Sequence, residues 1–155
     1  MTSSPRAVYD CNVLLQALIS SRGPARGAVE AVYEGRVELL LSPLILDELR
    51  DVAARPHLAM KFSLTEERVA DFIAVLRQNS RQVSVVPHIF EFDRDPKDAH
   101  YIDLAVAADA KLIVSRDNDL LSLGDRSTAQ GQDFATRFPN IEILTPTELL
   151  AQLRA

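Results

Sequence analysis

The chain has one cysteine, Cys11, and no apolar run of membrane length. A single cysteine excludes an intrachain disulfide, and the cysteine and histidines lack zinc-site spacing. Apolar runs such as residues 37–41 are far shorter than the roughly 20 residues of a membrane-spanning helix. Basic residues are in the minority, 17 Lys and Arg against 22 Asp and Glu, which argues against a broad nucleic-acid-binding surface. We therefore expect a cytoplasmic protein that does not bind zinc.

The 155 residues are 47% hydrophobic, which suits one compact domain that buries roughly 70% of its unfolded surface. No linker, composition break or internal repeat divides the chain. Residues 1–155 are therefore predicted to form a single domain.

Short apolar segments alternate with stretches in which apolar residues recur at helical spacing. This alternation predicts right-handed crossovers and an α/β fold, a three-layer α/β/α sandwich with a central, mostly parallel five-stranded sheet. A helix pair is expected within residues 43–79 and a mobile loop at 124–139. The expected strands are residues 6–10, 37–41, 83–87, 111–115 and 141–144.

Four acidic residues come at or soon after the ends of predicted strands: Asp10, Glu48, Asp98 and Asp117. In a parallel sheet they converge at the carboxyl edge, where ligands of such sheets bind. Clustered carboxylates repel one another, and Mg²⁺ or Mn²⁺ compensates their charge. The pattern predicts a hard-metal site that acts on a phosphate ester.

Three of the four acids also have a structural interpretation. Asp10 could end its strand in an Asx turn, and Glu48 could be an ordinary surface residue of a helix. Asp98 occupies the first turn of a helix that is expected to start at Asp95-Pro96, where the helix dipole favours acids. Asp103 is assigned to the solvated side of that helix or to a supporting role.

Four segments together resemble a PIN-domain protein over nearly the whole chain: VYDCNVLLQAL, SPLILDELRDVAARP, RDPKDAHYIDLAVAADAKLIVSRDNDLL and IEILTPTELL. The similarity points to the branch of toxins in toxin-antitoxin pairs, within the group that includes VapC-type ribonucleases. It implies a ribonuclease in which Asp10, Glu48, Asp98 and Asp117 are catalytic and hold Mg²⁺ or Mn²⁺. It further implies an RNA substrate and a cognate antitoxin.

The chain departs from the family pattern at two places. Ser115-Arg116-Asp117 stands where the family usually has Thr-Gly-Asp, and Cys11 stands where threonine is common. Ser115 keeps a hydroxyl, whereas Arg116 alters the local backbone or the contacts with substrate. For Cys11 we favour a small packed side chain.

Several neighbours are expected to assist the four acids. Supporting contacts to the ligands are predicted for Asn12, Ser42, Ser115 and Asp119, of which Asn12, Ser42 and Asp119 could also cap helices. Phosphate oxygens are expected to meet Arg94, Lys97 and Arg116. No site role is assigned to His57, His88 or His100.

Two other functions stay open. An aspartyl phosphotransferase would use Asp10 as its nucleophile, but it needs a second aspartate where Asn12 stands. A noncatalytic RNA- or protein-binding module would keep the fold without the reaction. If the chain is a toxin, apolar surface within residues 43–79 would serve a homodimer or an antitoxin segment.

Overall fold

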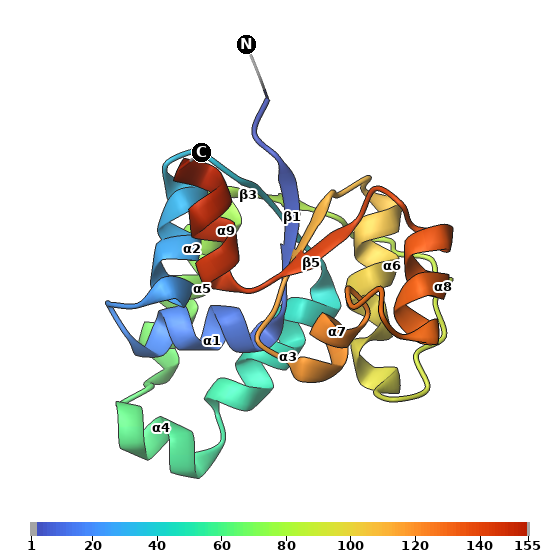
Figure 1. The fold of residues 1–155 in the computed structure, drawn as a ribbon. Helices are drawn as coiled ribbons and strands as arrows, with labels where there is room; N and C mark the ends of the chain where they lie inside the picture. Colours follow the sequence, from blue (N-terminus) through green and yellow to red (C-terminus); the bar gives the residue numbers. More distant parts are fainter. Residues whose placement is uncertain (1–2, 155) are drawn as a thin grey trace.

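The computed structural model describes residues 3–154 of the chain (Figure 1). Residues 1, 2 and 155 of the predicted domain lie outside this range. Five strands form one sheet in the order β3-β2-β1-β4-β5, and every neighbouring pair is parallel. The predicted α/β fold with a central five-stranded sheet is therefore confirmed. The strands are β1 (Arg6–Tyr9), β2 (Glu38–Leu41), β3 (Ser80–Gln82), β4 (Leu112–Val114) and β5 (Glu142–Leu144).

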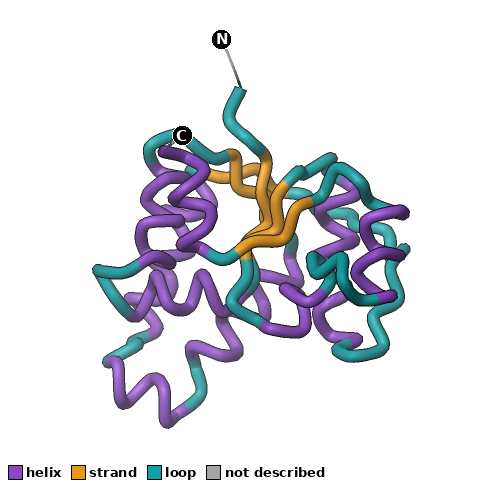
Figure 2. The backbone as a smooth tube through the Cα atoms, viewed as in Figure 1, coloured by secondary structure: helices purple, strands orange, loops and turns teal. Residues whose placement is uncertain are grey.

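Helices cover both faces of this sheet, as Figure 2 shows by colour. In Figure 1, α2, α5 and α9 lie on one side of the strands and α6 and α8 on the other. None of the helices in the described part of the chain could span a membrane. The helices are α1 (Cys11–Ile19), α2 (Pro24–Tyr33), α3 (Pro43–Ala53), α4 (Pro56–Phe62), α5 (Glu66–Gln78), the single 3₁₀ turn η1 (Pro96–Asp98), α6 (Ala99–Ala107), α7 (Asn118–Ser122), α8 (Ala129–Arg137) and α9 (Pro146–Arg154).

Apart from the charged first residues of β1 and β2, the central strands are apolar and buried, while the edge strands are not. All three residues of β4 are buried, as are the last three of β1 and of β2. The edge strand β3 has the sequence Ser-Arg-Gln and is largely exposed. This is the pattern of a parallel sheet that has helices on both faces, because only its edges reach water.

The third strand lies elsewhere than predicted. Residues 83–87 were expected to form it, but β3 ends before them and only one further ladder bond follows, from the amide of Val83 to the carbonyl of Leu41 at 2.8 Å. At this point β2 gives way to α3, so the chain beyond Val83 has no strand to pair with. Val85 is accordingly 82% exposed.

The predicted mobile loop at residues 124–139 is also wrong, because the segment contains α8. Thr128 caps this helix by accepting a hydrogen bond from the amide of Gly131 at 2.9 Å. Phe134 is buried and packs edge-on against Phe90, with ring centroids 5.9 Å apart. The segment is mostly polar, so its sequence did not reveal that one face of α8 packs against the core.

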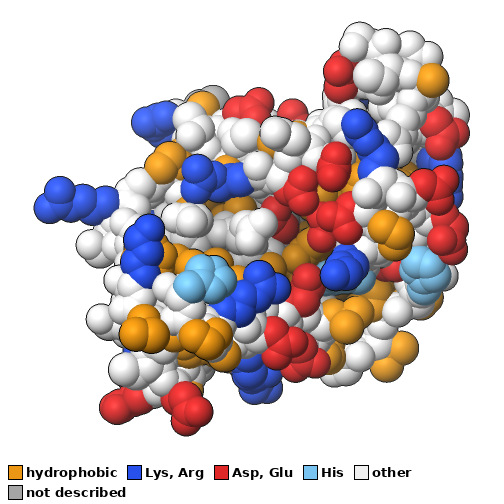
Figure 3. Space-filling view, turned by 90° about the horizontal axis from the view of Figure 1, so that it is seen from below, with side chains coloured by type: hydrophobic (Ala, Val, Ile, Leu, Met, Phe, Trp, Pro, Cys, Tyr) orange, Lys and Arg blue, Asp and Glu red, His pale blue; other side chains and the backbone are white. Residues whose placement is uncertain are grey.

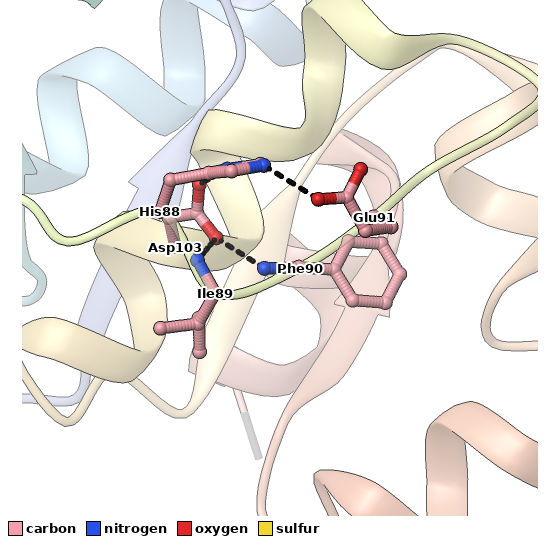
Figure 4. Close-up of polar contacts among 5 residues, drawn as sticks. All are labelled: His88, Ile89, Phe90, Glu91 and Asp103. Carbon is pink, nitrogen blue, oxygen red and sulfur yellow. Dashed lines mark hydrogen bonds and ion pairs between the residues drawn. The ribbon is translucent and has the colours of Figure 1, made fainter.

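Residues 83–95 cross from β3 towards α6 without regular structure, and Asp103 of α6 holds them in place (Figure 4). One carboxylate oxygen of Asp103 accepts hydrogen bonds from the amides of Ile89 and Phe90, at 3.0 and 2.9 Å. The other lies 2.8 Å from Nδ1 of His88. Asp103 is only 3% exposed, so its assignment to a solvated face was wrong.

The contact between His88 and Asp103 makes stability depend on pH. The hydrogen bond to Asp103, followed by the one to Glu91, raises the pKa of His88 above its usual 6.5. A histidine whose pKa is higher in the folded state stabilises fully below the unfolded pKa and loses that contribution as pH rises through the folded pKa. The contribution of this pair is therefore present in mild acid and fades in the alkaline direction.

We expect His88→Gln to lower the free energy of unfolding more at about pH 6 than at about pH 9, because glutamine cannot carry the charge. Urea denaturation of both proteins at the two pH values measures the difference. His57→Gln is the matched control, since His57 is an exposed residue of α4 with no carboxylate contact among the described residues. An equal loss at both pH values would show that the charge of His88 contributes nothing.

Candidate functional site

The candidate site lies at the carboxyl edge of the sheet, where β1 and β4 are neighbours and helices α1, α6 and α7 begin. Figure 3 views the molecule from this edge and shows acidic side chains gathered around a hollow, with Lys and Arg side chains at its rim. Parallel α/β sheets bind their ligands at this edge.

Asp10 directly follows β1 and is 3% exposed. Its Oδ1 accepts a hydrogen bond from the amide of Val13 at 2.9 Å, so Asp10 is the N-cap of α1. The prediction that Asn12 caps this helix is wrong; Asn12 is an exposed residue within it and makes no side-chain hydrogen bond to described residues. Burial raises the pKa of Asp10, and a hydrogen bond from Ser115 acts in the opposite direction.

Ser115 links two of the predicted acids. It follows β4 and is completely buried. Its hydroxyl donates to Oδ2 of Asp10 and accepts a hydrogen bond from the amide of Asp117 at 2.9 Å. Asp117 in turn caps α7 by accepting from the amide of Asp119 at 2.8 Å. The ends of β1 and β4 are thus joined through side chains of the site.

Three carboxylates form the tightest acidic group. One oxygen from each of Asp95, Asp98 and Asp117 lies within 4.8 Å of the others. The pKa of Asp98 rises to about 8, first because of burial, then because of the hydrogen bond with Asp117 and the charge of Asp95. Oxygen ligands at this spacing fit a hard dication such as Mg²⁺ or Mn²⁺. We call this group the aspartate triad.

Sequence reasoning missed Asp95, which it treated only as a helix start. Asp95 makes no capping hydrogen bond, and its carboxylate turns towards the triad instead. The available signal was the spacing Asp-Pro-Lys-Asp, because side chains three residues apart on a helical turn are neighbours. Asp98 lies in the first helical turn, as expected, at the end of η1 and directly before α6, while the irregular residues 83–95 separate it from the sheet.

Glu48 belongs to α3 and lies outside the aspartate triad. Its Oε1 accepts a hydrogen bond from the hydroxyl of Tyr101 at 3.3 Å and lies 2.5 Å from Nε2 of His100. The Tyr101 hydroxyl also accepts from the amide of Cys11 at 3.0 Å. Tyr101 thereby connects Glu48 with the start of α1. Ser42 caps α3 as predicted, accepting from the amide of Ile45 at 3.3 Å.

Cys11 directly follows Asp10 in the chain and is buried. Burial raises its pKa to about 12, followed by the negative charges of Glu48 and Asp10 and, more weakly, of Asp98. The thiol therefore stays protonated and is packed in the core, as expected from sequence. Glu48, Asp10 and Asp98 thus all act electrostatically on the same buried thiol.

The three predicted phosphate-binding residues are in different positions. Arg94 donates to the hydroxyl of Ser122 at 2.9 Å and lies 3.8 Å from Asp119, so α7 already holds it. Lys97 is exposed in η1. Arg116 lines a cavity of about 350 Å³ between the starts of α2 and α9. Of these three residues, only Lys97 neither forms an ion pair with a described residue nor lines a cavity.

Comparison with known proteins agrees with this geometry. The chain is 28% identical to an uncharacterized protein of Methanocaldococcus jannaschii over 143 residues, which are 92% of this chain and 86% of the relative. A family model described as PIN domain matches residues 6–119, a range that includes all four predicted acids. The chain therefore belongs to the PIN domain family, whose members are generally nucleases that use divalent metal ions.

Proposed function

We propose that the protein is a metal-dependent ribonuclease that hydrolyses RNA phosphodiester bonds. The observation that carries this proposal is the aspartate triad, with its ligand oxygens within 4.8 Å, beside the buried carboxylate of Asp10. Such an arrangement of like charges is unfavourable unless a proton or a cation lies between them. A divalent cation is the natural occupant in a PIN domain.

In this proposal Asp10, Glu48, Asp98 and Asp117 are the catalytic acids that hold Mg²⁺ or Mn²⁺, and Asp95 joins them. Bound metal would activate the attacking water and stabilise the negative charge that develops on the phosphate. The remaining side chains fix the acids, since Ser115 binds Asp10 and Tyr101 binds Glu48.

RNA would approach along the basic rim of the hollow. Lys97 is exposed in the turn between two triad members, so its ammonium group can reach a phosphate next to the scissile bond. Arg94 would exchange its contact with Ser122 for a phosphate oxygen, and Arg116 would meet a phosphate further along the strand.

The alternative of an aspartyl phosphotransferase has less support. A nucleophilic aspartate needs a carboxylate oxygen free to attack, whereas both oxygens of Asp10 accept hydrogen bonds, from Val13 and Ser115. A noncatalytic binding module would not explain why acids from three separate segments are brought together at one edge.

We further propose that the protein is the toxin of a toxin-antitoxin pair. A groove of about 300 Å³ between α3 and α5, partly lined by Ala53, Leu64, Val69 and Ile73, offers apolar surface for an antitoxin segment or for a second copy of the chain. Apolar side chains at helical spacing in a partner fit such a groove.

Asp10→Asn is expected to lower metal-dependent RNA cleavage by about 100-fold, because asparagine keeps the cap on α1 but removes the charge. Cleavage of a labelled single-stranded RNA in Mn²⁺ or Mg²⁺ measures the effect. Asp109→Asn is the matched control: Asp109 is exposed and has a positive φ of 55°, which asparagine tolerates. Unchanged cleavage by Asp10→Asn would point to a contaminating nuclease and overturn the proposal.

Neutralising one member of the aspartate triad should separate apo stability from metal binding. We expect Asp98→Asn to raise the melting temperature without metal at about pH 7, because the folded variant no longer has to take up the proton that the raised pKa of Asp98 demands, and to reduce the increase that Mn²⁺ produces. Thermal denaturation with and without Mn²⁺ measures both. Asp47→Asn, at an exposed aspartate that pairs with Arg50, should leave the Mn²⁺ effect intact. If Asp98→Asn did the same, the triad would not be the metal site.

The toxin role predicts growth arrest when the chain is induced alone in a bacterial host, and normal growth when Asp10→Asn is induced at the same level. Growth curves with matched expression measure this, because a ribonuclease without its antitoxin degrades cellular RNA. Normal growth with a wild-type protein that cleaves RNA after purification would refute the toxin role and leave the ribonuclease proposal standing.

A further inference from the structure

Helix α4 contributes more to the surface than to the core. None of its residues is fully buried, and in Figure 1 it stands out from the rest of the fold, on the side where α1, α3 and α7 also lie. Leu58 and Phe62 pack only partly against the core, and Met60 is 83% exposed. We call residues 55–65, from the N-cap of α4 to the N-cap of α5, the α4 arm.

The α4 arm is nevertheless fixed to the rest of the fold by Arg68 of α5. The guanidinium group donates to the carbonyl of Phe62, the last residue of α4, at 2.6 Å. It also donates to the carbonyls of Leu18 at 2.7 Å and Ile19 at 3.3 Å, at the end of α1. A surface that is ordered before its partner arrives loses little conformational entropy on binding. The arm is therefore suited to recognition.

The α4 arm is basic although the protein is acidic. The chain has a formal net charge of −5, yet no acidic residue occurs between Asp51 and Glu66, a stretch that contains Arg55 and Lys61. Both basic side chains belong to exposed residues, and neither forms an ion pair with a described residue. Nζ of Lys61 lies 5.2 Å from the centroid of the Phe62 ring. Exposed cations without a counter-ion attract a polyanion.

The basic arm adjoins the acidic edge of the sheet. Helical backbone continues through Ala54, the C-cap of α3, with φ −85° and ψ −7°. Arg55 follows Glu48 by seven residues, which is about two helical turns and places both on the same side of α3. Burial, followed by the charges of Glu48 and Asp10, raises the pKa of Cys11, whereas the positive charge of Arg55 lowers it. The charge of Arg55 thus reaches the start of α1, next to Asp10.

We propose that the α4 arm binds the sugar–phosphate backbone of an RNA strand through Arg55 and Lys61 and directs that strand to the aspartate triad. This inference rests on the proposed ribonuclease function. Contacts with phosphates position a nucleic acid without reading its bases, so the arm contributes affinity for RNA of any sequence. An acidic protein segment is also attracted to the arm, but only a strand of phosphodiesters gains from lying next to a nuclease site.

The first experiment measures how RNA binding depends on salt. Fluorescence anisotropy of a labelled single-stranded RNA is followed in EDTA, which stops metal-dependent cleavage, at about 50 to 200 mM KCl. The logarithm of the binding constant falls linearly with that of the salt concentration, by about 0.7 for each phosphate contact with a single strand. We expect the double variant Arg55→Gln/Lys61→Gln to reduce the slope by about 1.4 and the affinity at about 50 mM salt by roughly tenfold or more.

Two control variants separate the charge of the arm from other effects. Arg55→Lys/Lys61→Arg keeps both charges and should keep the wild-type slope. Arg36→Gln/Lys111→Gln removes two exposed basic residues that come just before β2 and β4, at the amino edge of the sheet, and should also keep it. A wild-type slope in Arg55→Gln/Lys61→Gln would overturn the inference and favour an acidic protein segment as the partner of the arm. An equal reduction in the amino-edge variant would overturn it too.

Steady-state cleavage of the same RNA in Mn²⁺ tells failure of this inference from failure of the proposed function. We expect Arg55→Gln/Lys61→Gln to raise KM by about tenfold and to leave kcat within about twofold, because the arm contacts the RNA but not the scissile bond. A lower kcat at unchanged KM would overturn the inference. A wild-type chain that binds RNA through the arm but never cleaves it would refute the ribonuclease proposal and leave the arm as an RNA-binding surface.

Discussion

The crowding of carboxylates at one edge of the parallel sheet is the constraint on which the site depends. Asp10 is almost fully buried, and Asp95, Asp98 and Asp117 approach one another closely. Burial and like charge both disfavour ionised carboxylates, and the pKa of Asp98, raised to about 8, reflects both. The fold can keep these groups together because its core and hydrogen bonds hold their backbones in place. A bound dication would offset the repulsion between the carboxylates.

Helix α6 does most of the positioning. Counting the residue just before it, the helix contributes a triad member, Asp98, followed by His100 and Tyr101 beside Glu48. One turn later, Asp103 binds the backbone amides of Ile89 and Phe90 and the imidazole of His88. Residues 88–90 belong to the irregular segment that also carries Asp95. Helix α6 thus contacts Glu48 of α3, follows directly on Asp98, and fixes the irregular segment that carries Asp95.

Membership in the PIN domain family gives this arrangement its chemical meaning, but the family does not specify an RNA or a biological role. Two local contacts act on the acids: Ser115 ties Asp10 to the start of α7, and the imidazole of His100 lies next to Glu48.

The sequence by itself determined the fold class, four of the five strands and the edge at which the acids gather, because short apolar segments that alternate with amphipathic helices are buried as strands between them. Only the tertiary structure decided the rest. The third strand formed at Ser80–Gln82 since β2 ends at Leu41, and a strand needs a partner. The contact of Asp95 and Asp98 with Asp117, and that of His100 with Glu48, join segments distant in sequence, and no local pattern encodes such contacts.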